Sequence, residues 1–428
     1  MKRRNIMKKC IALLSAIALV FVICSCNSEE SAITSTEPAK KINSTDVAND
    51  TQLRNNAPLP SGDTQFRLGD DQTGFIARCD MKVSNGSGDY MFYRGALYYY
   101  DYKSETTVPL CNKPDCKHDV DTYGSDCNAA FNESEFYYDK GIAYYDDCIY
   151  LLGNGNNKSD DLTSSSSAKT ISLFKVSKTG STREKLFSLF DATDINTVGV
   201  FTVHRGNVFW SINADNGTKL YSMSLENKDS KRLVFESNKP AAGINRFMGV
   251  GNSLYFAYSY AVDDNYNEWE GGICRYDFDT NEIYSLAKSY SCFTVADNRL
   301  FYLDSDIAPK TIYTCTLDGK NVKEIAPCPD NSWHIFSDSK YIYLSNSGND
   351  NIASGDYKLF VMTFDGEIVD TINIPKGCEI LVGATMQNIY IIDNGLKALD
   401  KSQIGVDKKE WRTIYSVKHD SGELVLNE

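Results

Sequence analysis

Short stretches of alternating apolar and polar residues, separated by turn residues, recur along most of the chain. The clearest copy is residues 291–326, where four apolar or β-branched runs are separated by a tight turn at Asp297-Asn298, an acidic loop and a tight turn at Asp318-Gly319. This pattern predicts four antiparallel strands. A single sheet of this size cannot bury both of its faces, so we expect further copies to pack against it.

The chain contains seven such copies, and each can be aligned on its third strand. The predicted third strands start at Leu97, Leu173, Leu220, Ile273, Ile312, Leu359 and Leu396. Most of the intervals are about 40 to 50 residues, which is the period of four-stranded propeller blades. The copies also share a period-two register, as in Tyr221/Met223/Leu225 and Tyr313/Cys315/Leu317. The sequence therefore predicts an all-β fold, a β-propeller of about seven four-stranded blades over residues 65–428, with six or eight blades as alternatives.

A hairpin is expected before each third strand. In the first copy we place it at 75–81 and 90–93, and in the last copy we place the outer strand at 411–417. Connections between strands two and three, and between blades, fall on one rim and include every long loop, whereas the opposite rim should carry only short turns. We call the first of these the long-connection rim. Because binding residues concentrate on loops carried by a rigid scaffold, it is the candidate functional face.

Residues 1–25 have the features of a bacterial lipoprotein signal peptide. A basic start that includes Lys2, Arg3 and Arg4 precedes an apolar run, residues 10–24, which is short for a membrane-spanning helix. Residues 23–26 resemble a lipobox, which implies that Cys26 is lipidated and becomes the new N-terminus. A plain anchor helix is the alternative. The polar segment that follows, residues 26–64, is expected to be a disordered tether, which would hold the propeller on the outer face of the cytoplasmic membrane.

The charge of the chain limits its partners. The formal net charge is −13, and removal of the basic signal segment would make the remainder more acidic. Such a surface repels nucleic acid and anionic lipid headgroups. The expected contact with the membrane is therefore the N-terminal lipid, and the expected ligands are neutral or cationic.

Two motifs resemble known families. The hairpins at 312–325 and 359–372 are similar to the Tyr-x-x-x-Leu-Asp-Gly repeats of TolB-like and DUF5050-type propellers. The stretch from Pro109 to Ala129 resembles a cysteine signature of uncharacterised propeller lipoproteins of anaerobic Firmicutes. These resemblances imply a propeller fold and an extracytoplasmic location, and they imply no catalytic residues.

A cysteine- and histidine-rich insert, residues 111–135, carries the sharpest cluster of candidate ligands: Cys111, Cys116, His118 and Cys127. Three thiolates and one imidazole suit a tetrahedral zinc ion, and a loop without a core of its own gains from such a cross-link. Four protein ligands would make the metal structural. In an exported protein, a disulfide between Cys127 and either Cys111 or Cys116 is the alternative, although a disulfide gives His118 no role.

The long-connection rim offers a weaker set of candidates for ligand binding: Asp263, Asp264, Tyr266, Trp269, Asp304 and Asp306. Carboxylates beside aromatic rings suit a glycan or a peptide. Paired carboxylates also permit a polysaccharide hydrolase or lyase, and a structural scaffold for an envelope protein complex is a third hypothesis. No catalytic motif of the G-x-S-x-G or H-E-x-x-H type occurs, which favours a protein that binds without catalysis.

Overall fold

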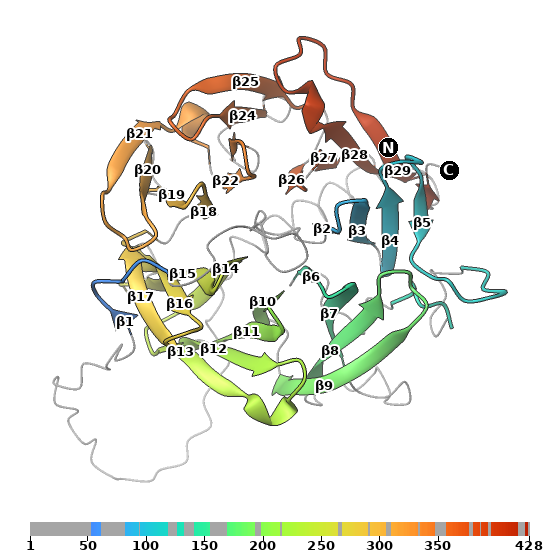
Figure 1. The fold of residues 1–428 in the computed structure, drawn as a ribbon, viewed down its shortest axis with the longest axis horizontal. Coiled ribbons are helices and arrows are strands. Elements are labelled where there is room, and N and C mark those ends of the chain that lie inside the picture. The colour runs from blue at the N-terminus through green and yellow to red at the C-terminus, as the bar shows by residue number, and fades with distance from the viewer. Residues whose placement is uncertain are drawn as a thin grey trace, which may run out of the picture.

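Seven antiparallel sheets are arranged in a ring around a central axis in the computed structural model (Figure 1). The structure describes residues 53–60, 82–93, 95–118, 126–131, 141–154, 169–192, 198–214, 216–263, 268–289, 292–304, 310–332, 334–346, 357–375, 380–385, 387–392, 395–417 and 424–426. The fold is therefore an all-β propeller of seven blades, as the repeat predicts. The helical elements in the described ranges are the short 3-10 turns η3 (Lys228–Ser230), η4 (Pro329–Asn331) and η5 (Lys401–Gln403).

Each blade takes its four main strands from one continuous stretch of chain, with the first strand innermost. Blades 1 and 2 consist of β2 (Lys82–Ser84), β3 (Gly88–Tyr93), β4 (Ala96–Asp101), β5 (Thr107–Pro109), β6 (Ile142–Tyr145), β7 (Cys148–Asn154), β8 (Lys169–Ser177) and β9 (Arg183–Ala192). Blades 3 and 4 consist of β10 (Val198–His204), β11 (Asn207–Ala214), β12 (Gly217–Ser224), β13 (Arg232–Ser237), β14 (Gly243–Val250), β15 (Ser253–Ala261), β16 (Trp269–Asp277) and β17 (Glu282–Ala287).

The remaining blades follow the same order. Blades 5 and 6 consist of β18 (Phe293–Ala296), β19 (Arg299–Leu303), β20 (Thr311–Thr316), β21 (Lys323–Pro327), β22 (His334–Ser337), β23 (Ile342–Ser345), β24 (Lys358–Met362) and β25 (Ile368–Asn373). Blade 7 consists of β26 (Ile380–Ala384), β27 (Asn388–Ile392), β28 (Gly395–Asp400) and β29 (Arg412–Val417), with β30 (Leu424–Leu426) added at its outer edge.

The predicted third strands all coincide with the third strands of the sheets, and the copy predicted at 291–326 corresponds to blade 5, whose strands run from Phe293 to Pro327. Tight turns make this register possible. Asp297 and Asn298 both have positive φ (48° and 55°), which is the type I′ geometry that matches the twist of a two-residue hairpin. In blade 1 the residues predicted as the first strand, 75–81, lie outside the described part, and the first strand described there is β2.

The loops on the two rims differ in length, with one correction to the prediction. On the long-connection rim, strands two and three are joined by 155–168 in blade 2, 262–268 in blade 4, 304–310 in blade 5 and 346–357 in blade 6. The opposite rim has mostly short turns. Blades 3 and 7 break this rule, because β12 and β13 are joined by 225–231, which contain η3, and β28 and β29 are joined by 401–411, which contain η5. The degenerate last copy gave no clear turn residues, so the longer connection of blade 7 escaped the prediction.

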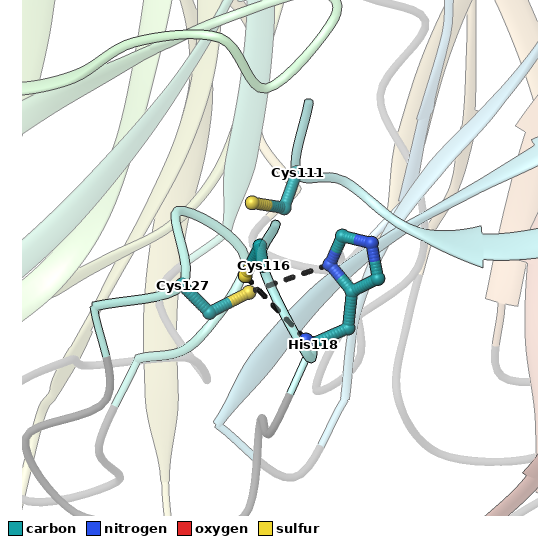
Figure 2. Close-up of side chains that lie close together, drawn as sticks. All are labelled: Cys111, Cys116, His118 and Cys127. Atoms are coloured by element: carbon teal, nitrogen blue, oxygen red, sulfur yellow. Dashed lines mark hydrogen bonds between the residues drawn. The ribbon is translucent and has the colours of Figure 1, made fainter. Parts of the chain in front are cut away.

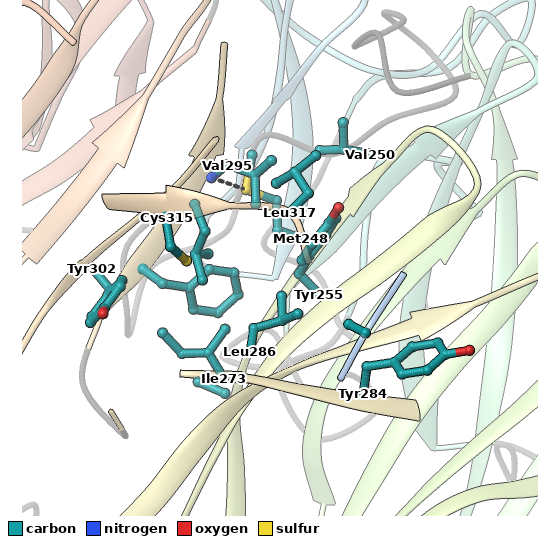
Figure 3. Packing of buried hydrophobic residues seen from close by; sticks show 14 residues of the cluster. Met248, Val250, Tyr255, Ile273, Tyr284, Leu286, Val295, Tyr302, Cys315 and Leu317 are labelled. Atoms are coloured by element: carbon teal, nitrogen blue, oxygen red, sulfur yellow. Dashed lines mark hydrogen bonds between the residues drawn. The ribbon is translucent and has the colours of Figure 1, made fainter. Parts of the chain in front are cut away.

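The apolar core lies between neighbouring blades, where the alternating residues of one sheet pack on those of the next. Figure 3 shows the packing of blade 4 on blade 5, with Met248, Tyr255 and Ile273 facing Val295 and Cys315. Cys274 and Cys315 are buried, as their place in the apolar register predicts. Burial raises the pKa of Cys315 to about 12, so its thiol stays neutral and acts as a small apolar side chain.

The prediction of a disordered tether is wrong for residues 53–60, which we call the N-terminal strap. β1 (Leu53–Arg54) pairs in parallel with β17 at the outer edge of blade 4. Ala57 is buried against the core between blades 4 and 5, and the carbonyl of Pro58 accepts a 2.7 Å hydrogen bond from the buried Arg275. A polar segment cannot form a core of its own, but an open strand edge and two small contacts are enough to hold it.

Blades 1 and 7 close the ring through side chains. The carboxylate of Asp89, in the inner half of blade 1, is fully buried and accepts hydrogen bonds from Tyr102 (2.6 Å), Thr385 (2.9 Å) and Tyr390. Thr385 and Tyr390 belong to blade 7. We call the contact between blades 1 and 7 the seam. At its outer end, the Thr107 hydroxyl donates a hydrogen bond to the carbonyl of Ile414 (3.1 Å).

Candidate metal centre

The insert leaves and rejoins the outer edge of blade 1 at one point. β5 pairs with β4 at Tyr98–Tyr100. The next backbone amide of β4, that of Leu97, instead donates a hydrogen bond to the carbonyl of Ala129 (2.9 Å). Ala130 also forms an isolated antiparallel bridge with Ala96. Residues 129–131 therefore continue the outer edge where β5 ends. The insert leaves this edge after β5 and returns to it at residue 129. Cys111 and Cys127 lie at the two ends of the insert, which we call its neck.

The four predicted ligands lie together at this neck (Figure 2). Their ligand atoms are all within 4.8 Å of one another, and the Sγ of Cys127 is 3.9 Å from Nδ1 of His118. Bond lengths of about 2.3 Å to sulfur and about 2.0 Å to nitrogen put the ligand atoms of a tetrahedral zinc site about 3.5 to 3.8 Å apart. The cluster is thus close to the size of such a site, and it can bind a metal ion.

The local sequence explains how the second pair of ligands reaches the first. Pro114 and Asp115 occupy the centre of a turn closed by the amide of Cys116 and the carbonyl of Lys113 (3.4 Å). Asp115 has a φ of 60°, and proline followed by a residue with positive φ is typical of a type II turn. His118 also has a positive φ, 53°, and its amide donates to the Sγ of Cys116 (3.4 Å). These reversals direct Cys116 and His118 back toward Cys127.

Blade 2 holds the insert by its backbone. Gly180, in the turn between β8 and β9, accepts hydrogen bonds from the amide of Asn112 (3.3 Å) and the side chain of Asn128 (2.7 Å). Arg183 donates to the carbonyl of Ala130 and lies 5.0 Å from the ring of Phe131. The β8–β9 turn joins strands three and four, so the insert begins on the long-connection rim and contacts a turn that belongs to the opposite rim. It therefore clamps blade 1 to blade 2.

The thiols of the cluster differ in their protonation. Burial acts to raise the pKa of Cys111, but hydrogen bonds from the backbone amides of Lys113 and Asn128 outweigh it, and the pKa lies below its ordinary value. Burial, with competition from the neighbouring thiols, raises the pKa of Cys127 to about 12. Amides that point at a sulfur stabilise its thiolate, which is the form that binds metal.

The rim candidates are only partly described. Asp264, Tyr266 and Asp306 lie outside the described residues, as does Cys26. Asp263 accepts a hydrogen bond from the amide of Glu268 (2.9 Å), and Asp304 accepts one from the amide of Thr311 (2.8 Å). Each of these two carboxylates closes its own loop. Trp269 is 36% exposed at the start of β16.

Comparisons with known proteins identify solved structures with a similar fold, but they identify no family. No family model matches the chain, and no curated protein matches it in sequence. Among solved structures, the tricorn protease superposes with a TM-score of 0.51 at 8% identity over 84% of this chain, which spans 36% of the tricorn chain. A prolyl endopeptidase structure gives 0.49 at 12% identity over 82% of this chain and 52% of its own. TolB from Acinetobacter baumannii gives 0.39 at 10% identity over 72% of this chain and 64% of its own.

The likeness to the tricorn protease concerns the fold alone and carries no activity over to this chain. Among the described residues, no helix is long and apolar enough to cross a membrane. Sequence reasoning found the four ligands of the insert from their residue types and spacing, but it missed Asn128, Gly180 and Arg183. A glycine in a five-residue turn and an arginine at the start of a strand give no local signal that they hold a segment about 50 residues away.

Proposed function

We propose that this protein is a lipid-anchored, extracytoplasmic propeller of the TolB-like, DUF5050 type, which binds a glycan or peptide on its long-connection rim without catalysis. Cys26 carries the lipid, and zinc held by Cys111, Cys116, His118 and Cys127 fastens the insert. The observation that carries the proposal is the contrast between the rims, because the connections of 7 to 14 residues between strands two and three of blades 2, 4, 5 and 6 all begin and end on the same side of the ring. A rigid ring with variable loops on one side is a common scaffold for binding.

The roles of the rim carboxylates favour binding over hydrolysis. A general acid or nucleophile needs a carboxyl group free to reach the substrate. Asp263 and Asp304 instead accept hydrogen bonds from backbone amides of their own loops. Trp269, partly exposed next to one of these loops, offers an aromatic surface of the kind that stacks on sugars and peptide side chains.

The test compares the two rims in binding to a panel of cell-wall polysaccharides and peptides. Trp269→Ala should weaken binding more than tenfold if its ring is an anchor. Val322→Ala is the matched control, because Val322 is 53% exposed in a turn on the opposite rim, and it should change nothing. Equal binding by both variants would overturn the assignment to the long-connection rim. Product release that is lost in Asp263→Asn or Asp304→Asn would overturn the non-catalytic assignment.

The anchor is tested separately in the whole cell. Cys26→Ala should move the protein from the membrane fraction to the medium, and the wild-type chain should partition into detergent. Retention of the variant in the membrane would favour an uncleaved anchor helix instead.

A further inference from the structure

A polar pocket lies on the outer perimeter of the ring, between the outer strands of blades 3 and 4. Its volume is about 280 Å³, and its walls come from β13, β17 and the N-terminal strap. Two arginines line it, Arg232 from β13 and Arg54 from the strap. Ligand pockets for drug-sized molecules begin at about 300 Å³, so this one suits a single sugar-sized molecule.

Neutral groups alone hold Arg232 in place. Its Nε donates to the hydroxyl of Ser222 (3.0 Å), and its two Nη atoms donate to Asn281 and to the hydroxyl of Tyr276. The guanidinium also lies over the Tyr276 ring, at 5.3 Å from the centroid. Within the described residues no carboxylate pairs with Arg232. Its charge is therefore uncompensated although its orientation is fixed.

The acidic group of the pocket is already neutralised. The two carboxylate oxygens of Glu282 bind different partners, Arg54 at 2.6 Å and the hydroxyl of Tyr284 at 2.7 Å. With one glutamate against two arginines, the lining carries one net positive charge in a chain whose formal net charge is −13. A local reversal of this kind attracts anions that the rest of the surface repels.

We infer that this pocket binds a small carboxylate of hexuronate size. An oriented guanidinium pairs with a planar carboxylate through two parallel hydrogen bonds, and the single excess charge matches a monoanion better than a phosphate dianion. The second guanidinium and the amide of Asn281 can reach ring hydroxyls, while Leu233, 39% exposed, offers an apolar wall. The ligand is either a free hexuronate or the uronic acid at the end of a glycan chain.

Docking of the strap completes the site. Arg54 belongs to β1 and reaches the pocket only because Leu53 and Arg54 pair with Ile283 and Tyr284 of β17. The carboxylate should therefore bind more weakly when the strap is released, and bound carboxylate should protect the strap from proteolysis. The site is on the perimeter, so this inference does not depend on the ligand of the long-connection rim.

The probe is D-glucuronate, titrated against the folded mature chain by saturation-transfer NMR. Glucose tests the uncharged ring, glucose 6-phosphate tests a dianion, and a uronic-acid-terminated oligosaccharide distinguishes the two sources of carboxylate. Arg232→Met keeps the apolar stem and should weaken glucuronate binding at least tenfold, since it removes a charge-assisted bidentate contact. Arg232→Lys should weaken it by less, and Arg54→Gln only a few-fold, because Arg54 is already paired.

Arg299→Gln is the matched control. Arg299 is an arginine of blade 5 whose partners are Asp297 and Asp365, and its loss should leave glucuronate binding unchanged. Raising the salt concentration should weaken binding of glucuronate by wild type. Binding of glucose equal to that of glucuronate, preference for glucose 6-phosphate, or full binding by a folded Arg232→Met variant would each overturn the proposal.

Discussion

The zinc site proposed for the insert gives the most direct test, because treatment with a chelator should destabilise the protein. Cys111 and Cys127 stand at the neck of an excursion of about 15 residues, and closing a loop of that length is worth about 3 kcal/mol in the chain-entropy treatment. The loss should reach the fold, because residues 128–131 are buried against both blades. An unfolding entropy of about 2.1 cal/mol/K per residue gives about 0.75 kcal/mol/K for a propeller of about 360 residues, so 1 kcal/mol shifts the melting temperature by about 1.3 °C. We therefore expect chelation to lower the melting temperature by about 4 °C.

The assay combines metal analysis with thermal unfolding and limited proteolysis. The wild-type chain should retain one zinc per molecule, and a chelator should both lower the melting temperature and speed cleavage within the insert. Cys127→Ser should lose the metal and show the same shift without chelator. Cys148→Ser is the control, because Cys148 is a half-buried thiol on β7, outside the cluster, and it should keep the zinc.

Two results would refute this reasoning. A chain that holds no divalent metal, has a mass two protons low and is destabilised by reductant instead of chelator contains a disulfide. A chain whose stability responds to neither reagent needs no cross-link at the neck, and the contacts with Gly180 and Arg183 would then be sufficient to hold the insert.

Two further predictions concern the seam and the clamp. Burial raises the pKa of Asp89 in the folded state, and its hydroxyl donors only partly offset this rise. The protonated carboxyl group therefore stabilises the fold fully below the unfolded-state pKa of about 3.9. This stabilisation is lost as the pH rises through the folded-state pKa. Asp89→Asn should therefore gain unfolding free energy relative to wild type between pH 4 and 7 in urea titrations, and a constant difference would contradict this. Gly180→Ala should cost about 2–4 kcal/mol, because φ is +70° and the new Cβ would lie 2.2 Å from the carbonyl oxygen of Leu110. Gly405→Ala has a similar φ of +83° with nothing within 4 Å, and it should cost only about 1–2 kcal/mol. Equal costs for the two glycines would show that the contact with the insert does not matter.

The blades were predictable because their signal is local. Cys315 alternates with Tyr313 and Leu317, and the face of blade 5 that packs on blade 4 follows from that alternation. Turn residues such as Asp297 and Asn298 then fix which strands pair. Seven copies of the same pattern leave few arrangements other than a ring, since every sheet has two faces to cover.

The strap, the clamp and the pocket were not predictable, because each depends on contacts between distant segments. Leu53 and Ala57 are too few to indicate structure by themselves, and they are ordered only because β17 leaves an open edge. Arg232 reads in the sequence as an ordinary surface arginine. The sequence does not show that its partners in blade 4 are the neutral side chains of Tyr276 and Asn281, because these contacts form only when blades 3 and 4 pack together.

The two ends of the described chain explain why the ring needs a polar seam. A propeller can be closed by a strand that the N-terminal segment adds to the last blade, but here the strap pairs with blade 4 and β30 extends blade 7 from its own side. Among the described residues, blades 7 and 1 are therefore joined by side chains. An apolar interface alone, such as Tyr98 on Leu396, tolerates sliding of one sheet over the other. The Asp89 carboxylate, which accepts hydroxyl donors from both blades, fixes the register, and its burial lowers the stability of the folded state at neutral pH.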